Sequence, residues 1–472
     1  MLFITTESFQ MKRLIFIVLA VFLSAILSNA QPHLSDHYAP TLIPDRIMLT
    51  LTATPDTSMA VNWRTSLAVD QGIVQLALAS PAPDFQKDMM AFKSTVTPLL
   101  TDRNGANYHS AVMTGLEPNK QYAYRVGNGT FWSEWMHFKT ADSKDQPLSF
   151  LYFGDAQNEL KSLWSRAIRG AYSKMPDADF MLHAGDLINR ANSDHEWGEW
   201  FYAGGWVYGM MPSIATPGNH EYYRDEAKNR SLSKHWRPTF TLPENGPEGS
   251  EETAYYVDYQ DLRIISLNSI SLQISKQDSA AQVKWLKKIL KENDQKWTVV
   301  MMHYPIYSSK FGRDNENLRN ALQPLFEKYK VDLVLQGHDH TYGRGSNLAL
   351  GNGKRTVGGP IYVVSVSGPK MYDLSLEDWM QRAASNTQLY QLIKIDGDVL
   401  NYEAYTVVGE LYDAFELQKQ KNGRNLFFEQ APEDAEERLE VPERFGKSYS
   451  EEDWEKYKAR FEAYKAKKEK KK

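Results

Sequence analysis

Five short polar motifs occur in the middle of the chain, and most of them directly follow an apolar run. In order they are Gly154-Asp155-Ala156-Gln157, Gly185-Asp186, Gly218-Asn219-His220-Glu221, His303 in the run VVMMHYP, and Gly337-His338-Asp339-His340. In an open α/β sheet the carboxyl ends of the strands line the ligand crevice, and loops there bring distant side chains together. We therefore expect the five motifs to meet at one site.

The polar residues of these motifs form a mixed set of oxygen and nitrogen ligands. The set consists of Asp155, Asp186, Asn219, His303, His338 and His340. One carboxylate can bridge two metal ions about 3.5–4 Å apart, and such a pair lowers the pKa of a bound water and neutralises phosphate oxygens. Imidazole suits zinc and iron, whereas carboxylates suit harder ions such as manganese. The set therefore predicts two divalent or trivalent ions of iron, zinc or manganese.

The motifs differ in how much each of them predicts. A Gly-Asp pair after a strand is usually a turn, and a single histidine is usually a packed or surface residue. The Gly-Asn-His-Glu and Gly-His-Asp-His motifs are more specific, and all five in this order make coincidence improbable. Next to Asn219, His220 is placed to protonate a leaving alkoxide or to contact a phosphate oxygen.

Three residues near the motifs are candidates for substrate binding: Tyr304, Tyr342 and Arg344. Arginine suits phosphate because its donors form a fork. The tyrosines could equally pack the walls of the loops, since tyrosine combines an apolar ring with one polar atom. Both interpretations of the tyrosines remain open at the level of the sequence.

The motifs need a scaffold of strands and helices, and the apolar pattern predicts one. Strands are expected at residues 148–153, 180–184, 262–268, 297–303, 331–336 and 360–367, and helices at about 160–173, 280–292 and 318–329. Strands that alternate with helices favour an α/β domain. We place this domain at residues 147–412.

The segment before this domain, residues 38–142, is expected to be all-β. Val61 and Trp63 alternate with Asn62 and Arg64, which is the period of a half-buried strand. A polar linker at residues 141–147 separates this segment from the α/β domain.

The final segment, residues 413–472, is predicted to be a charged and partly helical extension. Its aromatic residues recur at helical spacing: Trp454, Tyr457, Phe461 and Tyr464. A solvated helix packed lightly on the body of the protein is the expected structure, and a contact with anionic surfaces is the weaker alternative.

The first 30 residues are predicted to be a signal peptide. A short positive region at Met11-Lys12-Arg13 precedes an apolar run at residues 14–27 and the small residues Ser28-Asn29-Ala30. The apolar run is short for a membrane span. We expect a secreted, periplasmic or cell-surface protein without a stable membrane span after cleavage, and an uncleaved anchor is the alternative.

Composition limits the remaining possibilities. The chain contains no cysteine, so a metal site must use nitrogen and oxygen ligands and the fold uses no disulfide. A formal net charge of −5 does not favour nucleic acid as a partner. The expected partner is a small phosphoester, and no oligomeric state is predicted.

The ordered motifs resemble the calcineurin-like metallophosphoesterase superfamily over about residues 147–410. Upstream, the runs TGLEPNKQYAYRV and WSEWMHFKT resemble the fibronectin type III-like domain of purple acid phosphatases. The resemblance implies a β-sandwich of two mixed sheets flanked by helices, preceded by an all-β sandwich. It further implies that Asp155 and His340 bind a first metal, that Asp186 bridges, that Asn219, His303 and His338 bind a second metal, and that His220 is catalytic.

The chain departs from the family pattern at the first metal. Many members have a histidine two residues after the first aspartate, where this chain has Gln157, and purple acid phosphatases have a tyrosine where this chain has Asn189. Gln157 is the favoured replacement ligand, with Asn189 as the alternative, and the protein should not be purple. The resemblance implies an acid phosphatase-like, metal-dependent phosphoric ester hydrolase in which a metal-bound hydroxide attacks phosphate monoesters. A phosphodiesterase or nucleotidase, or a non-catalytic surface protein with a degraded metal site, are the alternatives.

Overall fold

The computed structural model describes residues 37–346, 355–357 and 359–469. The described residues from Pro40 onward belong to one compact unit. Within these ranges, no helix combines the length and the apolar character needed to cross a membrane. The predicted signal peptide lies outside the described residues.

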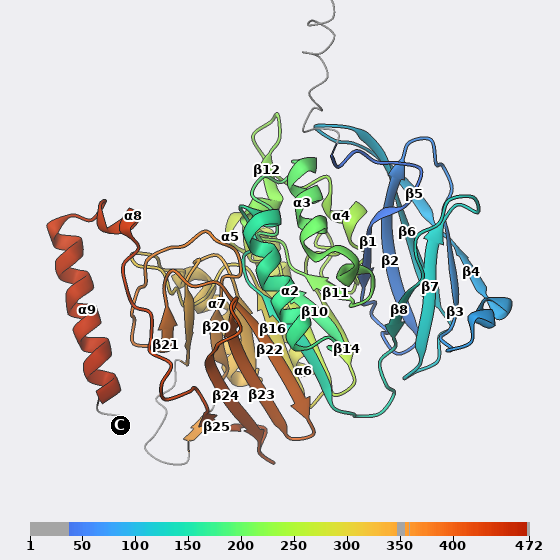
Figure 1. Cartoon of the computed structure of the whole chain (residues 1–472). Helices are drawn as coiled ribbons and strands as arrows, with labels where there is room; N and C mark the ends of the chain where they lie inside the picture. Colours follow the sequence, from blue (N-terminus) through green and yellow to red (C-terminus); the bar gives the residue numbers. More distant parts are fainter. Residues whose placement is uncertain (1–36, 347–354, 358, 470–472) are drawn as a thin grey trace, which may run out of the picture. The chain divides into compact units, whose positions relative to one another are not determined.

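The longest sheet runs through most of this unit (Figure 1). Its strands, in spatial order, are β19 (Arg355–Val357), β25 (Asn425–Glu429), β24 (Leu411–Lys419), β23 (Val399–Thr406), β22 (Leu389–Asp396), β9 (Leu148–Phe153), β10 (Phe180–His183), β11 (Ser213–Ala215), β1 (Asp45–Thr50), β2 (Ser58–Ser66), β6 (Gly105–Thr114) and β5 (Thr95–Leu100). The three strands β9, β10 and β11 are parallel, and β22 is antiparallel to β9. The sheet is therefore mixed.

A second mixed sheet carries the other predicted strands. Its order is β14 (Tyr255–Tyr259), β15 (Leu262–Leu267), β16 (Trp297–Met302), β17 (Leu333–Gln336), β20 (Ile361–Val364), β18 (Tyr342–Gly345) and β21 (Met380–Ala384). Strands β15, β16, β17 and β20 are parallel, whereas β14, β18 and β21 pair antiparallel. Two mixed sheets with flanking helices confirm the predicted fold class.

Alternate residues of the buried strands face different layers. In β16, Val299 and Met301 join the core that also contains Phe150 of β9, whereas Val300 and Met302 pack with residues of the helices. The period of two along a strand produces this separation. The second sheet, to which β16 belongs, is covered on both faces, which explains why its central strands are continuous apolar runs.

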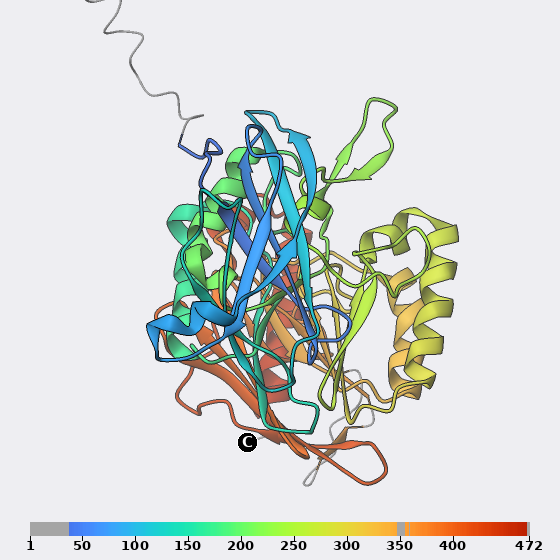
Figure 2. The ribbon, with the colours of Figure 1, turned by 90° about the vertical axis from the view of Figure 1, so that its right-hand side faces the viewer.

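The helices that pack against the second sheet are α5 (Ser269–Ile274), α6 (Lys276–Lys291) and α7 (Glu316–Lys328), and α6 and α7 lie side by side (Figure 2). Helix α6 begins where the Ser275 side chain accepts a hydrogen bond from the Asp278 amide, which satisfies a free donor at the helix start. Further helices are α2 (Ser165–Lys174), α3 (Asp194–Gly204) and the short α4 (Trp236–Thr239), and a hairpin is formed by β12 (Tyr222–Arg224) and β13 (Arg230–Leu232).

The N-terminal strands form an all-β region, as the sequence predicts. A four-stranded sheet in the order β4 (Met90–Lys93), β3 (Ile73–Leu78), β7 (Gln121–Gly127), β8 (Met136–Lys139) accompanies β1, β2, β5 and β6. The long sheet continues into this region, because β1 pairs in parallel with β11 through Thr50 and Ser213.

The last part of the chain differs from the prediction in two ways. Strand β24 crosses the boundary expected at residue 412, and β25 extends the same sheet to Glu429. Helix α9 (Glu451–Glu469), which follows the short α8 (Glu443–Gly446), is held more firmly than a lightly packed solvated helix. Its Tyr457 and Tyr464 are only 5% and 3% exposed, since they join the core beside the second sheet.

Candidate metal centre

The six predicted metal ligands converge from the two mixed sheets. The first three lie directly or shortly after neighbouring strands of the long sheet: Asp155 after β9, Asp186 after β10 and Asn219 after β11. The other three come from the second sheet: His303 follows β16, and His338 and His340 follow β17. Parallel strands place these loops at one edge of each sheet. The structure therefore brings the five motifs together, as we expect from the sequence.

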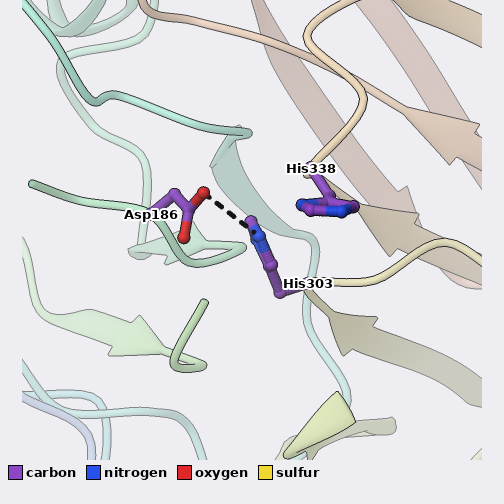
Figure 3. A group of neighbouring side chains, drawn as sticks. All are labelled: Asp186, His303 and His338. Atoms are coloured by element: carbon purple, nitrogen blue, oxygen red, sulfur yellow. Dashed lines mark ion pairs between the residues drawn. The ribbon is translucent and has the colours of Figure 1, made fainter. Parts of the chain in front are cut away.

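Two groups of ligand atoms share one aspartate. Asp186, His303 and His338 place one ligand atom each within 4.8 Å of one another, and so do Asp155, Asp186 and His340. Figure 3 shows the ring of His303 directed toward Asp186, with the ring of His338 on its other side. Asp186 is therefore in the position of a bridge between two sites.

In the group of Asp186, His303 and His338, which corresponds to the predicted second metal, hydrogen-bond acceptors face one another. His303 Nδ1 donates to the carbonyl of Ala184 at 2.9 Å, which directs Nε2 into the cluster. This Nε2 lies 3.3 Å from Asp186 Oδ2 and 3.2 Å from Asn219 Oδ1. A cation at this position would satisfy all three atoms.

The group of Asp155, Asp186 and His340, which corresponds to the predicted first metal, repeats this arrangement. His340 Nδ1 donates to the carbonyl of Lys370 at 2.8 Å, so its Nε2 points at Asp155 Oδ2, 3.1 Å away. That carboxylate oxygen is buried and has no hydrogen-bond partner in the part of the chain that the structure describes. A buried acceptor without a donor is costly, and a metal ion between Asp155 and His340 removes the cost. The donor set therefore fits a metal.

The electrostatics of the cluster favour positive charge. Burial, aided by the charge of Asp186, raises the pKa of Asp155 to about 7. Burial disfavours charge on His303 as well, but the carboxylates of Asp186 and Asp155 raise its pKa to about 9. A proton on His303 and a metal ion relieve the same excess of negative charge, so metal binding should release that proton.

Close backbone approach explains the glycines of the motifs. A Cβ added to Gly218 would lie 2.2 Å from Asp186 Oδ1, and one added to Gly337 would lie 2.3 Å from Asp155 Oδ1. The loops also place Asp186 and His338 at φ of 51° and 74°, a region that L-residues seldom adopt. Strain of this kind persists where the surrounding structure fixes the backbone, as at ligand-binding loops.

Glu221 is a positioning residue to which the sequence assigned no role. Its buried carboxylate accepts backbone hydrogen bonds from Asp186 and Leu187, both at 2.8 Å, and from Gly218 at 2.7 Å. It thereby ties the loop after β10 to the loop after β11. In the sequence, the only indication of this role is that Glu221 belongs to the Gly-Asn-His-Glu motif.

His220 lies at the edge of the cluster and beside a cavity. Its Nδ1 donates to the carbonyl of Asn189 at 2.5 Å, and its Nε2 lies 3.9 Å from Asp186 Oδ2. The cavity has a volume of about 550 Å³ and is lined by Asp102, Asn189, Arg190, Ala191, Asn192, Ser193, Asn219, His220, Tyr222 and Tyr223. A proton on Nε2 would therefore be available to a group that extends from the cluster into this cavity.

Of the two candidates for the missing first-metal ligand, Gln157 lies in the cluster. Its Nε2 donates to Asp186 Oδ2 at 2.7 Å and lies 3.1 Å from His340 Nε2. Its Oε1 accepts from Lys370 Nζ at 3.3 Å. Gln157 thus presents its amide nitrogen, not its oxygen, to the cluster. Asn189 lines the cavity, and its backbone carbonyl accepts the hydrogen bond from His220.

The three predicted substrate-binding residues lie in different places. Tyr304 is beside the cluster, with its ring 4.3 Å from that of His338. Tyr342 and Arg344 are wholly buried, and both bind Asp413: the Tyr342 hydroxyl at 2.6 Å and Arg344 at 2.6 Å and 2.9 Å. The prediction that these two contact substrate is corrected, because their polar groups are directed into the protein core.

Comparisons with known proteins agree with the architecture. The family model for calcineurin-like phosphoesterases matches residues 148–342, and that for the N-terminal domain of purple acid phosphatases matches residues 44–140. Probable purple acid phosphatase 20 of Arabidopsis thaliana is 27% identical, over 71% of this chain and 76% of its own length. Human acid phosphatase type 7 is 26% identical, over 70% of this chain and 78% of its own.

Solved structures show the same fold. A purple acid phosphatase from yellow lupin seeds superimposes with a TM-score of 0.68 at 20% identity, covering 81% of this chain and 75% of the lupin chain. The structure of PhoD gives a TM-score of 0.59 at 14% identity, over 91% of this chain and 98% of the other. The two family models and the curated relatives confirm the predicted family and enzyme class, a metal-dependent phosphoric ester hydrolase. The chain therefore combines a calcineurin-like phosphoesterase domain with the N-terminal domain of purple acid phosphatases, and purple acid phosphatases are its homologues.

Proposed function

We propose that this chain is a dinuclear-metal phosphomonoesterase. The observation that carries the proposal is the pair of acceptor groups that share Asp186. In this assignment Asp155 and His340 hold the first ion, Asp186 bridges, and Asn219, His303 and His338 hold the second. The bound ions would activate a water as nucleophile and neutralise phosphate oxygens.

The chain's own residues would orient the ester and move its proton. His220 is fixed by its bond to the Asn189 carbonyl, which leaves Nε2 at the border between the cluster and the cavity. From there it can protonate the departing alkoxide oxygen, and the cavity of about 550 Å³ can receive the alcohol. Tyr304, 8% exposed beside His338, is retained as a candidate contact for phosphate.

The composition of the first site favours a divalent ion. Neither the histidine nor the tyrosine of other family members is present, since Gln157 and Asn189 stand at those positions. Without a tyrosinate there is no charge transfer to ferric iron, so we propose a colourless protein that uses zinc, manganese or ferrous iron. A visible charge-transfer band in iron-loaded protein would contradict this.

We also propose that the protein is exported. The support is the sequence pattern of residues 1–30. A mature N-terminus at Gln31, read by N-terminal sequencing of the protein from its native host, is the expected result.

A phosphatase assay of metal-loaded protein tests the function. Purified protein is depleted of metal, loaded with Mn²⁺, Zn²⁺ or Fe²⁺ and assayed on monoesters and diesters. His220→Ala should retain two ions per chain while kcat falls about 10²–10⁴-fold, and the exposed His137→Ala is the matched control. Equal inactivity of wild type and His220→Ala on all esters would favour a non-catalytic binding protein instead.

A further inference from the structure

An ammonium group stands beside the first metal site. Lys370 Nζ donates to Gln157 Oε1 at 3.3 Å, and the amide nitrogen of the same Gln157 contacts Asp186 and His340. One amide group thus separates Lys370 from the bridging carboxylate. Lys370 forms no ion pair with a carboxylate in the described part of the chain.

The backbone fixes the place of this lysine. The carbonyl of Lys370 accepts from His340 Nδ1 at 2.8 Å, and the amide of Tyr372 donates to the carbonyl of His340 at 3.0 Å. The ring of Tyr372 lies 4.7 Å from the ring of His340 and 5.7 Å from that of Phe445. Phe445 belongs to the C-terminal extension, which therefore supports the loop behind the first metal site.

A second cation lies beside Tyr372. Arg313 Cζ and Lys370 Nζ are 5.8 Å and 5.6 Å from the centre of the Tyr372 ring. Arg313 uses Nη1 for Asp339, at 2.5 Å, and for the carbonyl of His338, at 3.3 Å. Its Nε and Nη2 make no hydrogen bond within the described ranges, so part of its fork is available.

Outside the metal cluster, the carboxylates around Tyr372 balance two of the three cations that lie beside its ring. Arg313 is balanced by Asp339, and Lys310, which also lies beside Tyr372, is 3.9 Å from Asp373. Lys370 is the cation left over. Its partners are a neutral amide and an aromatic ring, and a partly buried ammonium in such surroundings is stabilised when an anion joins it.

Phosphate monoesters and diesters differ in what they offer to this cation. A monoester has three terminal oxygens and a charge of about −1.5 to −2 at pH 7, whereas a diester has two terminal oxygens and a single charge. Two metal ions can each take one oxygen. The third terminal oxygen of a monoester carries negative charge and needs another cation. In a diester the corresponding oxygen is esterified and carries no charge.

We propose that Lys370, assisted by the free donors of Arg313, binds the terminal phosphate oxygen that the metal ions leave, and so selects monoesters over diesters. This inference rests on the proposed phosphoesterase function. Its ligand class is a dianionic phosphoryl group, which includes the product, inorganic phosphate.

The test compares two substrates and three variants of the metal-loaded full chain. The substrates are p-nitrophenyl phosphate and bis(p-nitrophenyl) phosphate, and the variants are Lys370→Gln, Lys370→Arg and Lys328→Gln. Lys328 is an exposed lysine beside Tyr329, with its Nζ 5.4 Å from the ring centre, so it is a matched control remote from the cluster. Metal content and inhibition by inorganic phosphate are measured for each protein.

Lys370→Gln should lower kcat/KM for the monoester about 10–100-fold, the size of a lost hydrogen bond to a charged group. The diester rate should change less than threefold, and phosphate should inhibit correspondingly less. Lys370→Arg should restore most of the monoester activity, and Lys328→Gln should match wild type.

Two outcomes overturn the inference, and they are distinguishable. Equal losses on both substrates, or a loss explained by missing metal, would show that Lys370 only orients Gln157 and would leave the phosphoesterase function intact. A wild-type protein inert toward both substrates, with two ions bound, would overturn the proposed function and this inference with it.

Discussion

Replacing Gln157 by histidine should strengthen metal binding at the proposed first site, which we expect to be the weaker of the two. Gln157 Nε2 lies 2.7 Å from Asp186 Oδ2 and 3.1 Å from His340 Nε2, so an imidazole at this position would bring a ligand nitrogen into the same group. The ammonium of Lys370 would keep that imidazole neutral, which is the form that binds metal. Changing a group that only supports a ligand alters metal affinity about 10–100-fold. An added ligand should therefore tighten the weaker ion at least tenfold, about 1.4 kcal/mol.

Calorimetric titration of metal-depleted protein with Zn²⁺ measures this change. Wild type should show two binding steps of different affinity, and Gln157→His should move the weaker step toward the stronger one. The control is Gln273→His, which adds an exposed histidine outside the cluster. If Gln157→His left the weaker dissociation constant unchanged or raised it, our reasoning about the incomplete site would be wrong.

Two further predictions concern stability. Arg344→Met should leave the buried carboxylate of Asp413 with the Tyr342 hydroxyl as a donor but without its charged partner. The variant should lose about 3–5 kcal/mol of unfolding free energy in urea with KM unchanged. A raised KM at normal stability would show instead that Arg344 contacts substrate. Burial lowers the pKa of His183 to about 3 and that of His235 to about 4. Because the unfolded chain protonates histidine near pH 6.5, the stability that these two neutral histidines contribute should be complete above that pH and decline as the pH falls toward 4. The raised pKa values of Asp155 and Glu252 act in the opposite direction, so the test is the difference in unfolding free energy between wild type and the His183→Gln/His235→Gln variant. This difference should shift against wild type by about 4 kcal/mol between pH 7 and pH 5, and a pH-independent difference would contradict this.

The convergence of the six predicted ligands could be predicted from the sequence because it depends on local features. Each motif directly or closely follows a short apolar run, and parallel strands bring such ends to one edge. The apolar runs are nearly continuous since both faces of β16 and β17 are covered. Strand direction and burial together were enough to predict which residues meet, although not which atom of Gln157 faces the cluster.

The sequence could not predict whether the side chains that follow the Gly-His-Asp-His motif point to the site or to the core. Tyr342 and Arg344 lie two residues apart on β18, so they share one face of the sheet. Whether that face points to the site or to the core depends on Asp413, about seventy residues further along the chain. Arginine chemistry suits phosphate and buried carboxylate alike, so the residue type could not decide.

A similar limit applies to β2. The alternation around Trp63 predicted a strand with one face in water, yet Asn62 and Arg64 are 1% exposed. Asn62 donates to the carbonyl of Pro238 at 3.2 Å, and Arg64 binds Asp45 at 2.6 Å. Polar residues on the second face of β2 thus meet partners from other parts of the chain, which an alternating pattern cannot distinguish from water.

The two proposed metal sites differ for a reason that lies outside the proposed ligands themselves. At the second site, His303 is oriented by the Ala184 carbonyl, and its Nε2 meets two oxygens. At the first site, turning the Gln157 amide to offer its oxygen would set its NH₂ against the ammonium of Lys370. Lys370 therefore opposes ligation by Gln157 for as long as that amide is its partner. An anion that engages Lys370 would remove this opposition, so phosphate binding and completion of the first site should favour each other.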